Sequence, residues 1–111
     1  MKHRVERVNN LIQEELSKII VKELEFPALV TITEVETSKD LSQALVKFSV
    51  LPSEKSEEVL KILNKNLRHL QYLLMKKINI KPMPRISFEI DWGLEKAAEI
   101  EKILLNDKIN E

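Results

Sequence analysis

Apolar residues in the first quarter of the chain recur at intervals of three and four, which is the spacing of one face of an α-helix. They are Val5, Val8, Leu11, Ile12, Leu16, Ile19, Ile20 and Leu24. This pattern predicts a helix over residues 3–24, and Pro27 predicts that the helix ends shortly afterwards.

Three later segments have the features of β-strands. Residues 30–37 are rich in Val, Ile and Thr, and residues 44–50 and 86–90 alternate apolar with polar side chains. The short polar segment from Ser38 to Ser42 predicts a turn. We therefore expect the first two strands to form a hairpin, which Pro52-Ser53 closes.

A second helical pattern lies between the hairpin and the third strand, over residues 59–78, and Ser56 is predicted to cap its start. Asn64 and Asn66 interrupt this pattern. Because asparagine is a poor helix former that tolerates a left-handed backbone, we expect a kink there. Pro82 and Pro84 exclude helix before the third strand. The apolar face is formed by Val59, Leu63, Leu67, Leu70, Leu74 and Ile78.

The predicted order is helix, strand, strand, kinked helix, strand, helix, with the last helix over residues 94–105. This order is typical of an α+β fold in which helices cover one face of a three-stranded sheet and leave the other face open. A chain of 111 residues is expected to form a single domain, residues 1–111, around one core. Each apolar stripe has a neighbour to cover it, so we expect a monomer.

The composition excludes several classes of site. The single glycine, Gly93, excludes glycine-rich phosphate loops and the GxxG clamp of RNA-binding KH domains. Without cysteine and with two histidines, the chain has no residues for a disulfide or a metal cluster, and we expect no cofactor. No apolar run approaches the ~20 residues of a membrane span. We expect a cytoplasmic protein with no membrane partner and no small-molecule substrate.

The charges are unevenly distributed, although 18 basic and 18 acidic residues balance overall. Residues 59–88 contain no acidic residue. A basic segment held on one face can bind phosphates even when the whole chain is neutral. We therefore predict a nucleic-acid-binding face formed by Lys61, Lys65, Arg68, Lys76, Lys77, Lys81 and Arg85.

Other polar residues near these cations have two interpretations. His69 and Tyr72 could stack or hydrogen-bond within the basic face, or could be an ordinary exposed imidazole and a ring packed beside lysine stems. Lys2, Arg4 and Arg7 form a smaller basic group at the start of the first helix. Cations there oppose the helix dipole and have no evident stabilising role, so we include Arg4 and Arg7 among the candidate RNA contacts.

Catalysis has little support in the sequence. Glu34 and Glu36 lie two apart in a predicted strand and so on one face, as paired carboxylates do. No histidine, nucleophile or metal ligand is near them, and an exposed strand face is ordinarily charged. Trp92, at a strand end, is more typical of rim packing than of base stacking. We expect a binding protein, not an enzyme.

Several segments resemble the ribosome-binding factor A family, bacterial assembly factors of the small ribosomal subunit. The most specific segment is residues 30–44, VTITEVETSKDLSQA, which forms the predicted strand-turn-strand unit. The similarity begins at residues 4–8, RVERV, and extends to residues 84–91, PRISFEID. It therefore covers most of the chain.

The resemblance implies a type II KH-like domain of order α-β-β-α-β-α in which the penultimate helix is kinked. It also implies a protein that binds free or immature 30S subunits and assists late maturation and processing of their 16S ribosomal RNA without cutting it. The partners implied are the 30S subunit, its 16S rRNA and ribosomal proteins.

Two positions depart from the family pattern. The Ala-x-Gly kink of the family falls on Asn66-Leu67-Arg68, so asparagine must make the break. Phe26-Pro27-Ala28 stands where the family usually has an acidic residue, proline and arginine. A basic contact is therefore missing at that point.

An alternative function is a protein-binding adaptor. In this interpretation the hairpin loop from Ser38 to Ser42, around Lys39 and Asp40, docks on a ribosomal protein, and the basic face is secondary. Charge reversal on the basic face and mutation of the loop would separate the two hypotheses.

Overall fold

The computed structural model describes the backbone of residues 2–93 and the side chains of residues 4–93. The predicted order of elements is confirmed over this range, and the helix expected at residues 94–105 lies outside it. The elements are α1 (Lys2–Glu23), β1 (Leu29–Thr37), β2 (Gln43–Leu51), the short 3-10 turn η1 (Ser53–Lys55), α2 (Ser56–Lys65), α3 (Leu67–Ile78) and β3 (Arg85–Ile90).

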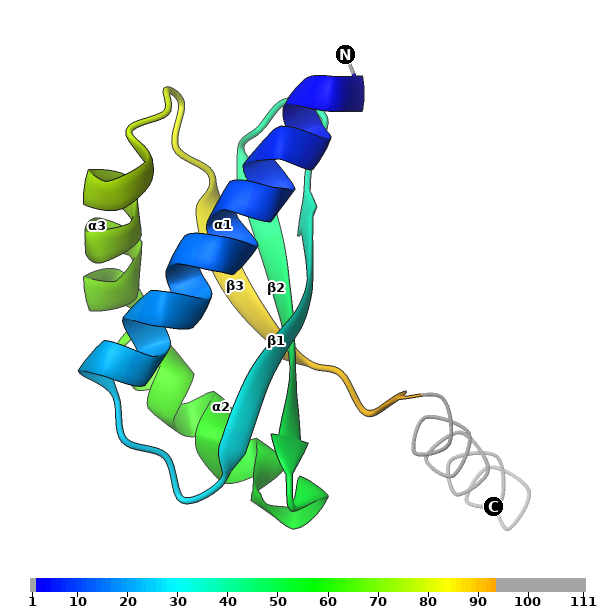
Figure 1. Ribbon diagram of the computed structural model, residues 1–111, viewed down its shortest axis with the longest axis vertical. Helices are drawn as coiled ribbons and strands as arrows, with labels where there is room; N and C mark the ends of the chain where they lie inside the picture. The colour runs from blue at the N-terminus through cyan, green and yellow to red at the C-terminus, as the bar shows by residue number, and fades with distance from the viewer. Residues whose placement is uncertain (1, 94–111) are drawn as a thin grey trace, which may run out of the picture.

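The three strands form one mixed sheet in the order β1-β2-β3. β1 and β2 are the predicted antiparallel hairpin, whereas β3 runs parallel to β2. A parallel neighbour requires a crossover connection, and α2 and α3 supply it. Figure 1 shows the three helices on one side of the sheet, with α1 lying diagonally across the hairpin and α3 beside it. This confirms the predicted α+β architecture, in which the described helices cover one face of the sheet and, within residues 2–93, leave the other face open.

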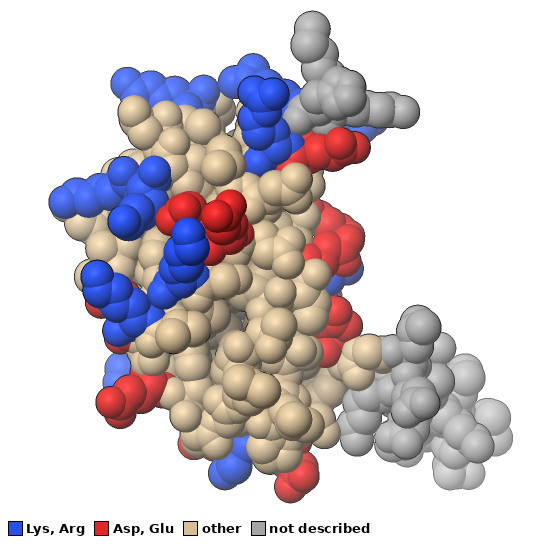
Figure 2. All heavy atoms as spheres, viewed as in Figure 1, with Lys and Arg blue, Asp and Glu red and all other residues tan. Residues whose placement is uncertain are grey.

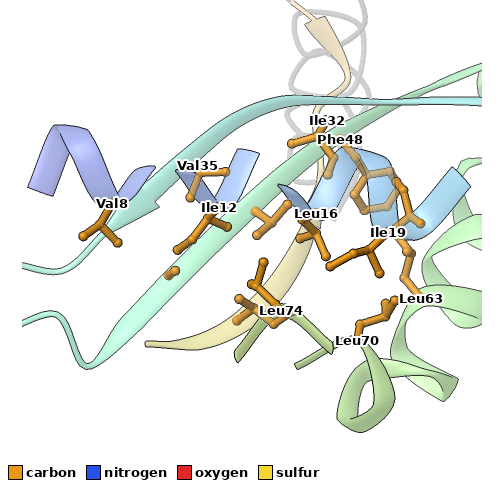
Figure 3. Close-up of a cluster of buried hydrophobic side chains, with 14 of the residues drawn as sticks. Val8, Ile12, Leu16, Ile19, Ile32, Val35, Phe48, Leu63, Leu70 and Leu74 are labelled. Carbon is orange, nitrogen blue, oxygen red and sulfur yellow. The ribbon is translucent and has the colours of Figure 1, made fainter. Parts of the chain in front are cut away.

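The core lies between the sheet and the helices (Figure 3). Alternate residues of β2, including Val46 and Phe48, are fully buried, which confirms the predicted alternation. α1 contributes Ile12 and Leu16 from its apolar stripe. α3 contributes Leu74. Burying such side chains is the main favourable term in folding, so this core fixes which helix faces remain in solvent.

A β-bulge shifts the register of β1. Ile32 pairs with Phe48 and Glu34 pairs with Lys47, which leaves Thr33 without a partner. The Thr33 hydroxyl donates a hydrogen bond to Asp91 Oδ2 at 2.7 Å, across the sheet. This bond, with a second from the Gly93 amide, lowers the pKa of the Asp91 carboxyl.

The predicted kink is confirmed at Asn66, the residue between α2 and α3. Its amide nitrogen lies 3.2 Å from the carbonyl oxygens of both Ile62 and Leu63, and its side-chain Nδ2 donates to Ile62 O at 2.8 Å. The break does not use the left-handed backbone that asparagine tolerates, because Asn66 has φ −103° and ψ 10°. The shared backbone hydrogen bond ends α2 without positive φ.

The predicted cap at Ser56 is wrong. Ser56 is the first residue of α2, and the residue is only 1% exposed. Lys55 occupies the cap position and makes no capping hydrogen bond with its side chain. The turn η1 leads directly into α2, so Ser56 lies in the interior instead of capping the start of the helix.

Candidate nucleic-acid interface

The cations of α2 and α3 lie on the exposed sides of these helices. Lys61 and Lys65 belong to α2, and Arg68, Lys76 and Lys77 belong to α3. The opposite sides are buried, as predicted. None of these five side chains forms an ion pair with a described residue. Figure 2 shows Lys and Arg side chains gathered over α3, at the left of the molecule.

Further cations lie at the end of the molecule where α1 begins. Lys81 follows α3 in the loop toward β3 and is exposed. Arg4 and Lys39 line a depression of about 410 Å³ together with Pro82, so the hairpin loop, the α3–β3 loop and the start of α1 meet there. Figure 2 shows basic side chains across this end. The sequence placed Lys39 in the docking loop and not among the candidate RNA contacts, because only the folded hairpin brings it to the same depression as Arg4.

We call this surface the basic face. It consists of the α2 and α3 cations, the loop cation and the two cations beside the start of α1. These are Lys61, Lys65, Arg68, Lys76, Lys77, Lys81, Arg4 and Lys39.

Two of the predicted contacts are set apart from the basic face. Arg7 lines a shallow depression with Glu6 and Glu14, whose charges oppose its own. Arg85 begins β3 and is exposed on the open side of the sheet, because the next residue, Ile86, is buried toward the helices. The structure therefore does not bring these two arginines together with the helical cations.

The open side of the sheet has the opposite charge character. Lys47 Nζ lies 3.6 Å from Glu34 Oε2 and 3.5 Å from Glu36 Oε1. These carboxylates raise the pKa of Lys47, and Glu36 has the larger effect of the two. Glu34 and Glu36 do share one face, as predicted, but a lysine bridges them. With Glu89 and Asp91 nearby, this side disfavours a polyanion and directs it toward the helices.

The aromatic and imidazole candidates have different surroundings. Tyr72 is 47% exposed within the basic face, and Lys76 Nζ lies 4.8 Å from the centre of its ring. His69 Nε2 lies 3.7 Å from Glu23 Oε2 of α1, a contact that is ionic when the imidazole is protonated. Trp92 lies with Thr33 at a hollow on the sheet, away from α3. Of the three, Tyr72 is the one that lies among the cations of the basic face.

The hairpin loop is held by its own side chains. Asp40 Oδ1 accepts hydrogen bonds from the hydroxyls of Ser38 and Ser42, each at 2.7 Å, and from the Ser42 amide at 3.1 Å. These bonds, led by that from Ser38, lower the pKa of Asp40 to about 2. Leu41 has φ 61° and is buried. The loop therefore presents Lys39 from a fixed backbone.

The described part of the chain contains no group of three metal-ligating side chains. None of its helices is long and apolar enough to cross a membrane. The described residues form a KH-like α+β fold with a break between α2 and α3, a basic surface on the helices and an acidic surface on the sheet. This arrangement suits the binding of an extended polyanion.

Comparison with known proteins identifies the family. The model of the ribosome-binding factor A family matches residues 4–104. The chain is 36% identical over 112 residues to ribosome-binding factor A of Lactobacillus acidophilus, a match that covers 97% of this chain and 93% of the relative. It is 33% identical over 106 residues to that of Coxiella burnetii, covering 94% and 89% respectively. The chain belongs to the ribosome-binding factor A family.

Solved structures agree with this assignment. The crystal structure of ribosome-binding factor A from Thermus thermophilus matches with a TM-score of 0.68 at 25% identity, over 78% of this chain and 94% of that one. A homology model of the Thermus protein, fitted into the cryo-EM map of a 30S complex, matches with a TM-score of 0.60 at 26% identity, over 71% and 86%. The family resemblance and the KH-like fold predicted from the sequence are confirmed.

Proposed function

We propose that this protein binds free or immature 30S small ribosomal subunits in the cytoplasm, as a monomer, and assists the late maturation and processing of their 16S rRNA. A homology model of the Thermus relative has been fitted into the cryo-EM map of its complex with the 30S subunit. The observation that carries the proposal for this chain is the basic face, whose cations have no acidic partner among the described residues. Such cations are available for phosphates.

Binding alone can assist maturation. A protein that binds one conformation of an RNA more tightly than another shifts the population toward the conformation it prefers. The basic face can do so because its cations stand on two packed helices, where the break at Asn66 sets Lys65 and Arg68 at an angle fixed by hydrogen bonds. The protein thus needs no catalytic group to favour a mature arrangement of 16S rRNA.

The loop from Ser38 to Ser42 supports a second candidate, the adaptor that docks on a ribosomal protein. Its internal hydrogen bonds give it the fixed shape that a docking loop requires. However, Lys39 lies beside Arg4 at the end of the basic face, which favours the loop as part of the RNA-binding surface. We therefore rank RNA binding first.

Co-sedimentation with purified 30S subunits tests the proposal. The variant Lys65→Glu, Arg68→Glu, Lys76→Glu reverses three exposed cations of the basic face. It should lose at least about 10-fold in affinity at moderate salt, because each lost phosphate contact removes counterion release. The matched control Lys65→Arg, Arg68→Lys, Lys76→Arg keeps every positive charge at the same positions and should bind like the wild type.

Circular dichroism establishes that both variants are folded before they are compared. If the folded reversal variant binds 30S subunits as tightly as the wild type, the basic face is not the binding surface. If instead Ser38→Ala with Asp40→Ala abolishes binding and the reversal does not, the adaptor hypothesis replaces the first.

A further inference from the structure

The surface has a hollow of about 410 Å³ where α3 ends and the chain turns toward β3. Its apolar lining comes from Met75, Ile80 and Met83, and its polar lining from Lys76, Asn79 and Lys81. Ile80 and Met83 are packed against the core, so the floor of the hollow is part of the folded interior. The hollow lies at the opposite end of α3 from the Asn66 break.

The exposed side of α3 beside the hollow combines apolar and basic groups. Tyr72 and Met75 are each 47% exposed, although both are large and apolar. They are three residues apart and so lie on neighbouring turns of one side of the helix. Lys76 lies over the Tyr72 ring. A helix surface that only faces solvent does not require large apolar side chains, so the exposure of Tyr72 and Met75 beside the hollow indicates a binding surface.

Asn79 supplies a hydrogen-bonding group at the rim. It ends α3 with a left-handed backbone of φ 50° and ψ 51°, and its amide nitrogen donates to Met75 O at 3.2 Å. Its exposed side-chain amide takes part in none of the hydrogen bonds formed by the described side chains. An amide offers both a donor and an acceptor, which suits the edge of a nucleobase.

We propose that this hollow takes one unstacked nucleobase from a single-stranded segment of RNA, with the flanking phosphates on Lys76 and Lys81. The proposal rests on the proposed function and names the RNA feature that this end of the basic face recognises. The apolar floor fits the face of a base, and the two lysines match the charge of the backbone. Paired A-form RNA cannot enter, because its bases remain stacked inside the duplex.

The test compares a short single-stranded oligouridylate with an abasic ribose-phosphate chain of the same length, by fluorescence anisotropy. The wild type should bind the base-containing strand about 10-fold more tightly, since a stacked base adds to the phosphate contacts. Met75→Ala, and separately Asn79→Gly, should reduce this ratio toward one and leave abasic binding unchanged. Asn79→Gly keeps the left-handed backbone available. Val21→Ala, which removes a 76% exposed apolar side chain from α1, should keep the wild-type ratio.

The outcomes separate the two proposals. If the wild type binds both strands equally and still binds 30S subunits, the base hollow is disproved and the proposed function stands. If Met75→Ala and Asn79→Gly keep the wild-type ratio, the base binds elsewhere and the hollow is again disproved. If the wild type binds neither of the two strands and does not bind the 30S subunit, the proposed function itself is contradicted.

Discussion

The side chain of Gln71 in α3 forms two hydrogen bonds to the backbone at the start of β3, like those that a neighbouring strand would form at this edge of the sheet. Its Oε1 accepts from the Ile86 amide at 2.8 Å, and its Nε2 donates to Pro84 O at 2.8 Å. One side-chain amide thus satisfies a donor and an acceptor at the sheet edge. These two bonds fix α3, which carries Arg68, Lys76 and Lys77 of the basic face, to the edge of the sheet.

Replacing Gln71 with alanine should therefore destabilise the fold. The Ile86 amide and the Pro84 carbonyl lose their partners, and we expect the free energy of unfolding to fall by about 1–3 kcal/mol in urea titrations. Gln43→Ala is the control, because Gln43 is exposed and its side chain makes no described hydrogen bond. Equal unfolding midpoints for the two variants would contradict the role given to Gln71.

The two asparagines that end α2 and α3 should respond differently to replacement by glycine. Asn66→Gly removes the side-chain bond to Ile62 O and adds backbone freedom at a residue with negative φ, so stability should fall by about 1–2 kcal/mol. Asn79→Gly should leave stability within about 0.5 kcal/mol of the wild type, because glycine suits positive φ. Thermal unfolding measures both. The reverse order would contradict the roles given to the Asn66 side-chain bond and to the positive φ of Asn79.

Asp40 should make the hairpin loop sensitive to acid. Its pKa is lowered from 3.8 to about 2 in the folded protein, so the folded state binds this proton less readily than the unfolded state. The contribution of Asp40 is complete above pH 3.8 and is lost as the pH falls toward 2. Asp40→Asn should therefore show a shallower loss of stability than the wild type in urea titrations across this window. Parallel curves for the two proteins would contradict the assignment.

The hydroxyl of Thr33 should control the ionisation of Asp91. Thr33→Val removes the largest cause of the lowered Asp91 pKa, so this pKa should rise toward 3.8. NMR titration of the carboxyl carbon measures it. Thr31→Val is the control, since Thr31 is an exposed threonine of the same strand without a described side-chain hydrogen bond. A shift in the control as large as in Thr33→Val would contradict a specific role of the Thr33 hydroxyl.

The elements of the fold could be predicted because their faces are periodic. The alternation from Ala44 to Val50 and the stripe of α1 each place one side in the core, and burial follows them closely. The bulge at Thr33 could not be predicted, because the extra residue is a threonine that suits either face. The sequence has no signal for the left-handed backbone at Leu41 either, because leucine rarely adopts positive φ. The conformational cost is offset by burial of the leucine side chain.

The candidate site was predictable in part. The acid-free run of residues 59–88 identified the cations of α2 and α3, because amphipathic spacing places them on one side. The parallel placement of β3 beside β2 has no local signature. Arg85 lies away from the helices because the alternation of β3 buries Ile86 and leaves Arg85 on the open side of the sheet. Lys39 and Arg4 line one depression although they are far apart in the sequence, so only the fold reveals that they lie on the same end of the molecule.

The most direct test of the central claim is the salt dependence of 30S binding. If the basic face contacts rRNA phosphates, log affinity should fall linearly with log salt concentration. The variant Lys65→Gln, Arg68→Gln, Lys76→Gln should then have a slope smaller in magnitude by about 2, as three phosphate contacts are removed. Identical slopes for the folded variant and the wild type would contradict the claim that these cations bind the RNA backbone.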